Sequence, residues 1–333
     1  MFFFNTLNQS EALTPLLLLL IALIINIFLG QNSLSGRLKG YSPNTLNKII
    51  EWFDLKLNRE NRSPLDRAVR GGITTIFVLL LSGIFGLVII WLSANITFAW
   101  LFELFLILMV LDQSNTHKKV IEINKALSNR DIKNARQKLM NLTPEVSEKS
   151  DSYSIARTSI EFIAISLVTR VLAPVFYYAL FGFIGLAIYH AITVLTIKIG
   201  NKTERYQDFG FTVNRLKFII LFIPSLLSGP LIVLACLFVP TANPIKSLKS
   251  ILKYRNKIHN YNLGIALSAY AGAFDLALCQ PKNCIGVTKK ETWIGTGTAK
   301  ATHKDIQRCL YLFSTVGLIN GLLIITLIIM DHL

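Results

Sequence analysis

Six apolar blocks dominate this 333-residue chain and constrain its fold more than any other feature. They lie at 16–29, 73–92, 96–111, 176–199, 218–239 and 310–330. A helix needs about 20 apolar residues to cross the hydrocarbon core of a bilayer, where every backbone polar group must be bonded internally. We therefore expect an all-α polytopic membrane protein with about five or six transmembrane helices, forming a single integral membrane domain over residues 1–333.

Basic residues are concentrated in the connections between the apolar blocks. Eight Lys or Arg stand against four Asp or Glu between residues 31 and 71, and nine stand against five between 113 and 158. The positive-inside rule assigns such loops to the cytoplasm. The net charge of +15 then reflects topology and attraction to the lipid bilayer. No basic motif interleaved with aromatic residues points to a nucleic-acid partner.

Two polar segments have the periodicity of amphipathic helices near the membrane surface. Leu46, Ile49, Ile50, Phe53 and Leu57 share one helical face, which predicts a short interfacial helix. Residues 114–151 are predicted to form a cytoplasmic helical segment of two short helices, the second capped by Asp131.

Metal and disulfide chemistry receive no support from the sequence. The five histidines show no metal-ligand spacing, so no metal site is predicted. Cys279 and Cys284 are separated by four residues, a spacing typical of neither a zinc knuckle nor a redox pair. We expect free cytoplasmic thiols.

Prolines in two regions of the chain predict breaks in long apolar helices. Ala173-Pro174 interrupts the chain that begins at Ser154, and a kink or turn is expected there. Pro224 and Pro230 fall inside the block 218–239, which suggests a broken or re-entrant helix.

A densely polar stretch at 203–210, called the polar island below, separates two apolar blocks. Its Arg205 offers a planar fork for phosphate or carboxylate, and Arg215 follows ten residues later, so the two could clamp an anion. The alternative, attraction of the same arginines to lipid headgroups, is slightly favoured by the sequence alone.

Several short motifs, in this order and spacing, resemble those of the CobD/CbiB family, which is related to the AmpE branch of membrane proteins. The motifs are residues 156–161 (ARTSIE), 173–177 (APVFY), 203–210 (TERYQDFG), 215–216 (RL), 293–297 (WIGTG) and 301–308 (ATHKDIQR). The resemblance implies a protein of cobalamin biosynthesis in the bacterial cytoplasmic (inner) membrane. It further implies adenosylcobinamide-phosphate synthase activity, in which the amine of 1-aminopropan-2-ol or its phosphate forms an amide with a propionate of a corrinoid, adenosylcobyric acid.

Site residues and cofactors follow from the resemblance alone. Glu161 and Asp208 are the candidate catalytic residues. The candidates for substrate binding are Ser114, His117, Arg205, Tyr206, Arg215 and Asn262. ATP and Mg²⁺ are implied by the family, although the sequence contains no motif for either.

The chain departs from the family pattern mainly where acids are expected. Thr169-Arg170 stands where the family has an Asp, and Lys217-Phe218 replaces a pair of Asp residues; further departures are at Leu142-Thr143, Ile165-Ser166, Thr193, Thr196 and Ala266-Leu267. Carboxylates are the groups that would hold magnesium with ATP. An alternative function is therefore a catalytically degenerate paralogue that acts as a membrane sensor or scaffold.

Overall fold

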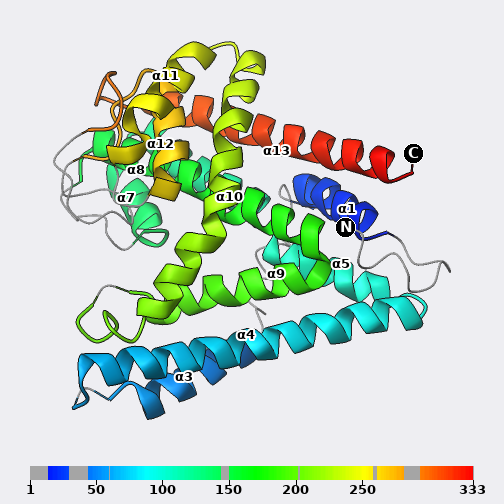
Figure 1. Ribbon diagram of the computed structural model, residues 1–333. Helices are drawn as coiled ribbons and strands as arrows, with labels where there is room; N and C mark the ends of the chain where they lie inside the picture. Colours follow the sequence, from blue (N-terminus) through cyan, green and yellow to red (C-terminus); the bar gives the residue numbers. More distant parts are fainter. Residues whose placement is uncertain are drawn as a thin grey trace.

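The computed structural model describes residues 14–29, 44–59, 61–143, 150–201, 203–257, 261–280 and 293–332. These residues form a bundle of α-helices (Figure 1). Its helices are α1 (Pro15–Leu29), α3 (Asn44–Leu57), α4 (Pro64–Asn95), α5 (Ala99–Val110), α6 (Gln113–Ser128), α7 (Ile132–Met140), α8 (Ser152–Ser166), η1 (Leu167–Leu172), α9 (Ala173–Ile199), α10 (Phe211–Ala235), η2 (Cys236–Phe238), α11 (Pro244–Tyr254), η3 (Arg255–Lys257), α12 (Tyr261–Ala273) and α13 (His303–His332).

Four stretches of the described chain are long and apolar enough to cross a membrane. They are Pro64–Asn95, Ser152–Ile199, Phe211–Phe238 and His303–Asp331, and the shorter apolar helices α1 and α5 pack among them. The predicted all-α polytopic membrane fold is confirmed. In Figure 1 the α3–α4 connection, α7 and the polar island lie toward one side, whereas the α4–α5 connection and the C-terminus lie toward the other. In this view the described α3–α4 connection and α7, which belong to the two basic segments, share one side of the bundle (Figure 1).

The 48-residue stretch Ser152–Ile199 is a helical hairpin rather than one straight rod. A straight helix of this length would measure about 72 Å, more than twice the hydrocarbon thickness. At Gly182 the backbone adopts φ 61° and ψ −152°, a region open essentially only to glycine. The ring of Tyr189 returns to stack on Tyr177 at 5.7 Å, and its hydroxyl reaches the carbonyl of Thr169.

This geometry corrects the prediction of a kink or turn at Ala173-Pro174. The chain stays helical through Pro174, because the π-helical segment η1 precedes it and widens the last turn. The reversal occurs eight residues later, at Gly182. Proline removes a hydrogen-bond donor, but only the φ of Gly182 permits the chain to turn back.

Helix α10 is also continuous, so the suggested break at its prolines is wrong. Pro224 and Pro230 both lie inside the helix. Pro224 has no N–H for the carbonyl of Ile220, four residues earlier. The hydroxyl of Tyr177 in α9 donates to that carbonyl at 2.7 Å. A neighbouring helix therefore satisfies the group that proline leaves open, as helices in membranes require.

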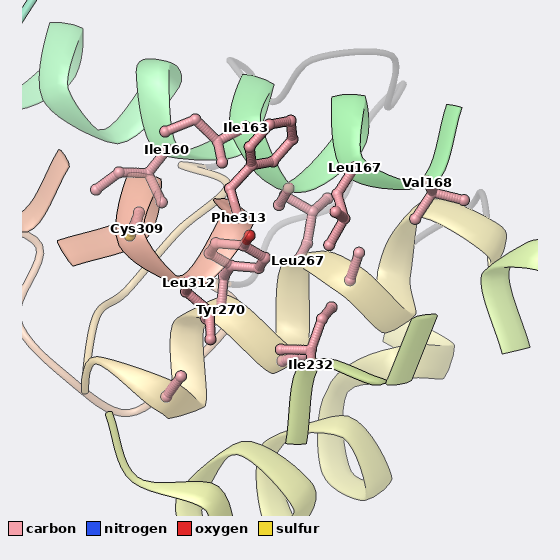
Figure 2. Packing of buried hydrophobic residues seen from close by; sticks show 14 of the residues in the cluster. Ile160, Ile163, Leu167, Val168, Ile232, Leu267, Tyr270, Cys309, Leu312 and Phe313 are labelled. Carbon is pink, nitrogen blue, oxygen red and sulfur yellow. The ribbon is translucent and has the colours of Figure 1, made fainter. Parts of the chain in front are cut away.

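The main hydrophobic core lies where α8, η1, α10, α12 and α13 meet (Figure 2). Its labelled members are Ile160, Ile163, Leu167, Val168, Ile232, Leu267, Tyr270, Cys309, Leu312 and Phe313. Helix α12 is buried along nearly its whole length. The π-helical segment η1 packs against α6, α8, α9, α10, α12 and α13, so it lies at the centre of the bundle.

The predicted amphipathic helices are present. In α3, Ile50 is buried, and Leu46, Ile49 and Leu57 pack on the same cluster against α4 and α9. Asp131 caps α7, accepting a hydrogen bond from the Asn134 backbone at 3.1 Å. Helices α6 and α7 pack on each other and on α8, so both belong to the bundle.

Candidate functional site

The polar island is tied to helix α3 through one carboxylate. Asp54 accepts hydrogen bonds from the guanidinium of Arg205 at 3.1 Å and from the hydroxyl of Tyr206 at 2.9 Å. The Asp54 side chain is only 12% exposed, whereas that of Arg205 is 43% exposed. Burial, followed by the bond to Asp54, raises the pKa of the Tyr206 hydroxyl. The charge predicted to bind an external anion is therefore partly engaged within the protein.

Helix α4 holds the other side of the island. Arg67 and Asn58 both donate to the backbone carbonyl of Arg205, and the guanidinium of Arg67 lies 3.9 Å from the carboxylate of Asp208. A Cβ on Gly71 would lie 1.9 Å from the Phe209 carbonyl oxygen, so glycine allows the two backbones to approach. Arg67 thus contacts both Arg205 and Asp208.

Arg215 is not part of this network. Its side chain is exposed on α10, and its guanidinium lies over the ring of Phe211 at 5.3 Å. The predicted clamp of Arg205 and Arg215 has no contact in the structure that joins the two side chains.

A second polar centre lies at η1 and is called the Arg170 centre below; it comprises Asp112, Arg170 and Lys217. The guanidinium of Arg170 forms an ion pair with Asp112, which precedes α6. Arg170 also lies over the ring of Phe162 at 5.2 Å. Lys217, on the second turn of α10, is close enough to Arg170 for the two positive charges to interact.

The π-helical geometry explains how α6 and the return arm of α9 dock at this place. Near Pro174, the carbonyls of Thr169 and Arg170 lack the usual helical donors. The hydroxyl of Tyr189 donates to Thr169, and the backbone N–H of Asp112 approaches Arg170 at 3.5 Å. π-bulges of this kind occur frequently at functional sites.

The Arg170 centre lies deep in the bundle. Along the chain, Arg170 is 12 residues from the reversal at Gly182. Asp112 follows the end of α5, a helix of 12 residues that begins after the α4–α5 connection. Both paths correspond to about 18 Å of helix. Ionisable groups at such depth in a membrane protein are costly and mark functional sites by default.

Three substrate-binding candidates border this centre. Asn262 is fully buried at the start of α12, and its amide donates to the carbonyl of Phe218, the residue after Lys217. Ser114 accompanies Asp112 at the start of α6, where its backbone N–H donates to Asn26 of α1 at 3.1 Å.

His117 follows one turn later on α6, and its side chain is partly buried. Burial lowers the pKa of its imidazole. The imidazole is therefore biased toward its neutral form.

Glu161 lies elsewhere, on the buried face of α8. Its carboxylate is 2% exposed and accepts a hydrogen bond from the backbone of Cys279 at 2.7 Å. One turn earlier Arg157 donates to Gln280 at 3.0 Å and lies over the ring of Trp293. These contacts fix the strand-like pairing of Leu278 with Ile294 against α8.

The cysteines differ in part from the prediction of free thiols. Cys236 and Cys309 are free and buried, but Cys279 is disulfide-bonded, so the prediction is wrong for that residue. Cys284 lies outside the described residues.

The carboxylates near these sites are held by nearby donors. Asp54, Asp112 and Asp208 each face an arginine, and Glu161 accepts from a backbone amide. Within the described ranges no group of three or more His, Cys, Asp or Glu is arranged to hold a metal ion. This donor set does not fit the Mg²⁺ that the family resemblance implies, because magnesium requires oxygen ligands gathered at one point.

Sequence reasoning missed the partners that define both polar centres. Asp54 lies in a helix that the sequence predicts only from its apolar face, and Arg67 precedes the apolar block 73–92. The sequence marks Lys217 only as a departure from the family pattern. The signal that could have found Lys217 is its position directly before the apolar block 218–239.

Comparison with known proteins covers most of the chain. The family model described as CobD/Cbib protein matches residues 19–313. The cobalamin biosynthesis protein CobD of Brucella anthropi is 27% identical over 317 residues, covering 93% of this chain and 96% of that protein. Its namesake in Halalkalibacterium halodurans is 28% identical over 265 residues, covering 79% and 82%. No solved structure matches the chain significantly. Because the family model spans far more than half of its length, the chain belongs to the CobD/CbiB family.

Proposed function

We propose that this protein acts in cobalamin biosynthesis as an adenosylcobinamide-phosphate synthase-like ligase of the bacterial inner membrane. In this reaction the amine nitrogen of 1-aminopropan-2-ol, or of its phosphate, forms a bond to the carbonyl carbon of a corrinoid propionate. The single observation that carries the proposal is the family match over residues 19–313. Relatives named for cobalamin biosynthesis and aligned over most of both chains support the same role.

Two features of the structure support a site for anionic substrates on the basic side of the bundle. The Arg170 centre, which is reachable from the side of the polar island, and the polar island itself both contain an arginine paired with a carboxylate. Guanidinium groups bind carboxylate and phosphate with two parallel hydrogen bonds. A corrinoid propionate and an aminopropanol phosphate both present such groups.

ATP and Mg²⁺ remain expectations of the family. Since the described carboxylates do not gather into a magnesium site, we assign neither group to particular residues and derive no step through them.

A second function, a non-catalytic sensor or scaffold, is favoured by the way the carboxylates near the polar island pair with arginines. Asp54 and Asp208, which a ligase could use for catalysis, contact Arg205 and Arg67. Such pairs hold the island to the bundle and have a structural role that requires no chemistry.

A complementation experiment separates the two functions. The full chain is expressed in a strain that lacks its own synthase and is supplied with cobyric acid, and cobinamide phosphate is measured by mass spectrometry. A ligase restores the product, as the authentic synthase does in a parallel culture. Absence of product, with the protein detected in the membrane fraction, rejects the ligase and favours the scaffold.

A further inference from the structure

Lys217 is a cation without a counterion in the described structure. It lies on the second turn of α10 and is partly buried. Its ammonium makes no hydrogen bond or ion pair with the described residues. Helix α10 packs against η1, which carries Arg170, and the positive charge of Arg170 acts on the ammonium. A partly buried ammonium beside a second cation costs free energy, since it has lost water without gaining an opposite charge.

The three residues of the Arg170 centre have one more positive charge than negative charges. Asp112 supplies one negative charge, and it already pairs with Arg170. Arg170 and Lys217 supply two positive charges, so the Arg170 centre carries an excess of one. Charged groups within a membrane protein usually pair with an opposite charge or mark a ligand site, so a bound anion would balance this partly buried excess.

We propose that Arg170 and Lys217 together bind a phosphate group. The guanidinium can donate two parallel hydrogen bonds to adjacent phosphate oxygens, while the ammonium provides a point charge with rotatable donors. The Arg170 side chain is 37% exposed, compared with 14% for Asp112, so the guanidinium keeps a face open to a ligand while it pairs with Asp112. This binding does not depend on the proposed ligase activity.

The phosphate can belong to a soluble phosphomonoester or to a lipid headgroup, since both present the same oxygens. The position of Lys217 near the start of α10, six residues after Phe211, makes it reachable from the side of the bundle where the polar island lies. Exposed apolar side chains such as Phe218 and Ile219 follow directly on α10, which keeps lipid within reach of the same place.

The test measures thermal unfolding of the full-length protein purified in detergent and freed of phospholipid. Inorganic phosphate is titrated against chloride at constant ionic strength, and a parallel series uses nanodiscs of phosphatidylcholine with or without phosphatidic acid. The test variant is Lys217→Met, which preserves the length of the side chain. The matched control is Lys249→Met, an exposed lysine of α11.

Each outcome has a defined meaning. A soluble ligand is supported if phosphate raises the melting temperature, if Lys217→Met needs about tenfold or more phosphate for the same rise, and if Lys249→Met behaves like wild type. Protection by phosphatidic acid alone, with the same dependence on Lys217, supports the site with a lipid headgroup. Protection that is equal in both variants, or absent from both series, overturns the proposal. The ligand-free Lys217→Met protein is expected to be at least as stable as wild type, so a failure to fold does not mask the result.

Discussion

Asp54 of α3 and Arg205 of the polar island are joined by an ion pair of 3.1 Å although 151 residues separate them in sequence. Asp54 also accepts a hydrogen bond from Tyr206. The most distinctive polar segment of the chain is therefore held by a helix that the sequence presents as an interfacial anchor. Stability and any ligand binding by Arg205 are coupled through this carboxylate.

Replacing Asp54 with Asn is expected to lower the free energy of unfolding by about 1–2 kcal/mol, because a 12% exposed acceptor loses the charge that strengthens its hydrogen bonds. Denaturation of the purified protein in detergent measures the loss. Glu122→Gln is the control, since Glu122 pairs with Lys138 on an exposed surface and should change stability by less than about 0.5 kcal/mol. Equal losses in the two variants would contradict a special role for Asp54.

Two glycines of α4 provide a matched test of the contact with the island. In Gly71→Ala the new Cβ meets the Phe209 carbonyl oxygen at 1.9 Å, and we expect a loss of about 2 kcal/mol or more. Gly83→Ala meets nothing within 4 Å and should be neutral or stabilising by up to about 1 kcal/mol, because alanine favours helix. Melting temperatures and protease sensitivity near residue 205 report both effects. A tolerant Gly71→Ala variant would show that the island can move away from α4.

His117 should make stability depend on pH. Burial lowers the pKa of its imidazole in the folded protein, so below the ordinary value near 6.5 the unfolded chain binds the proton more readily. Stability is then full above pH 6.5 and falls as the pH drops through that value toward the lower folded pKa. Melting temperatures between pH 7.5 and 5 should fall less steeply in His117→Gln. An unchanged slope would assign the dependence to other groups.

Glu161→Gln separates a structural from a catalytic role for this carboxyl group. The amide keeps an oxygen that can accept from the Cys279 N–H, so the variant is expected to accumulate in the membrane at nearly the wild-type level. If Glu161 acts as an acid or base in the proposed ligation, product formation falls about 100-fold or more. Mass spectrometry of cobinamide phosphate, normalised to protein in the membrane fraction, gives the answer. Full activity would remove Glu161 from the catalytic residues.

Patterns that depend on neighbouring residues were predictable. The apolar blocks predicted helices in a membrane because backbone groups there can bond only within the helix. The apolar face containing Ile50 and the cap at Asp131 were also predictable, since helical periodicity and capping act over a few residues. The structure confirms both.

Features that depend on distant partners were not predictable from the same patterns. Proline at positions 174 and 224 suggested breaks, but η1 and the hydroxyl of Tyr177 let both helices continue. The true reversal is at Gly182, and a glycine within an apolar run gives no sign of its φ. The polar centres depend likewise on Asp54 and Asp112, which only folding brings to Arg205 and Arg170.

Consecutive residues alone were enough to predict helices that enter a membrane and to recognise the motifs of the CobD/CbiB family, because hydrophobic length and local motifs are properties of neighbouring residues. Tertiary structure decided which charges meet. It pairs Asp54 with Arg205, pairs Asp112 with Arg170, and leaves Lys217 beside a second cation. Electrostatic energy in a bundle depends on separation in space and on burial, and neither is fixed by distance along the chain.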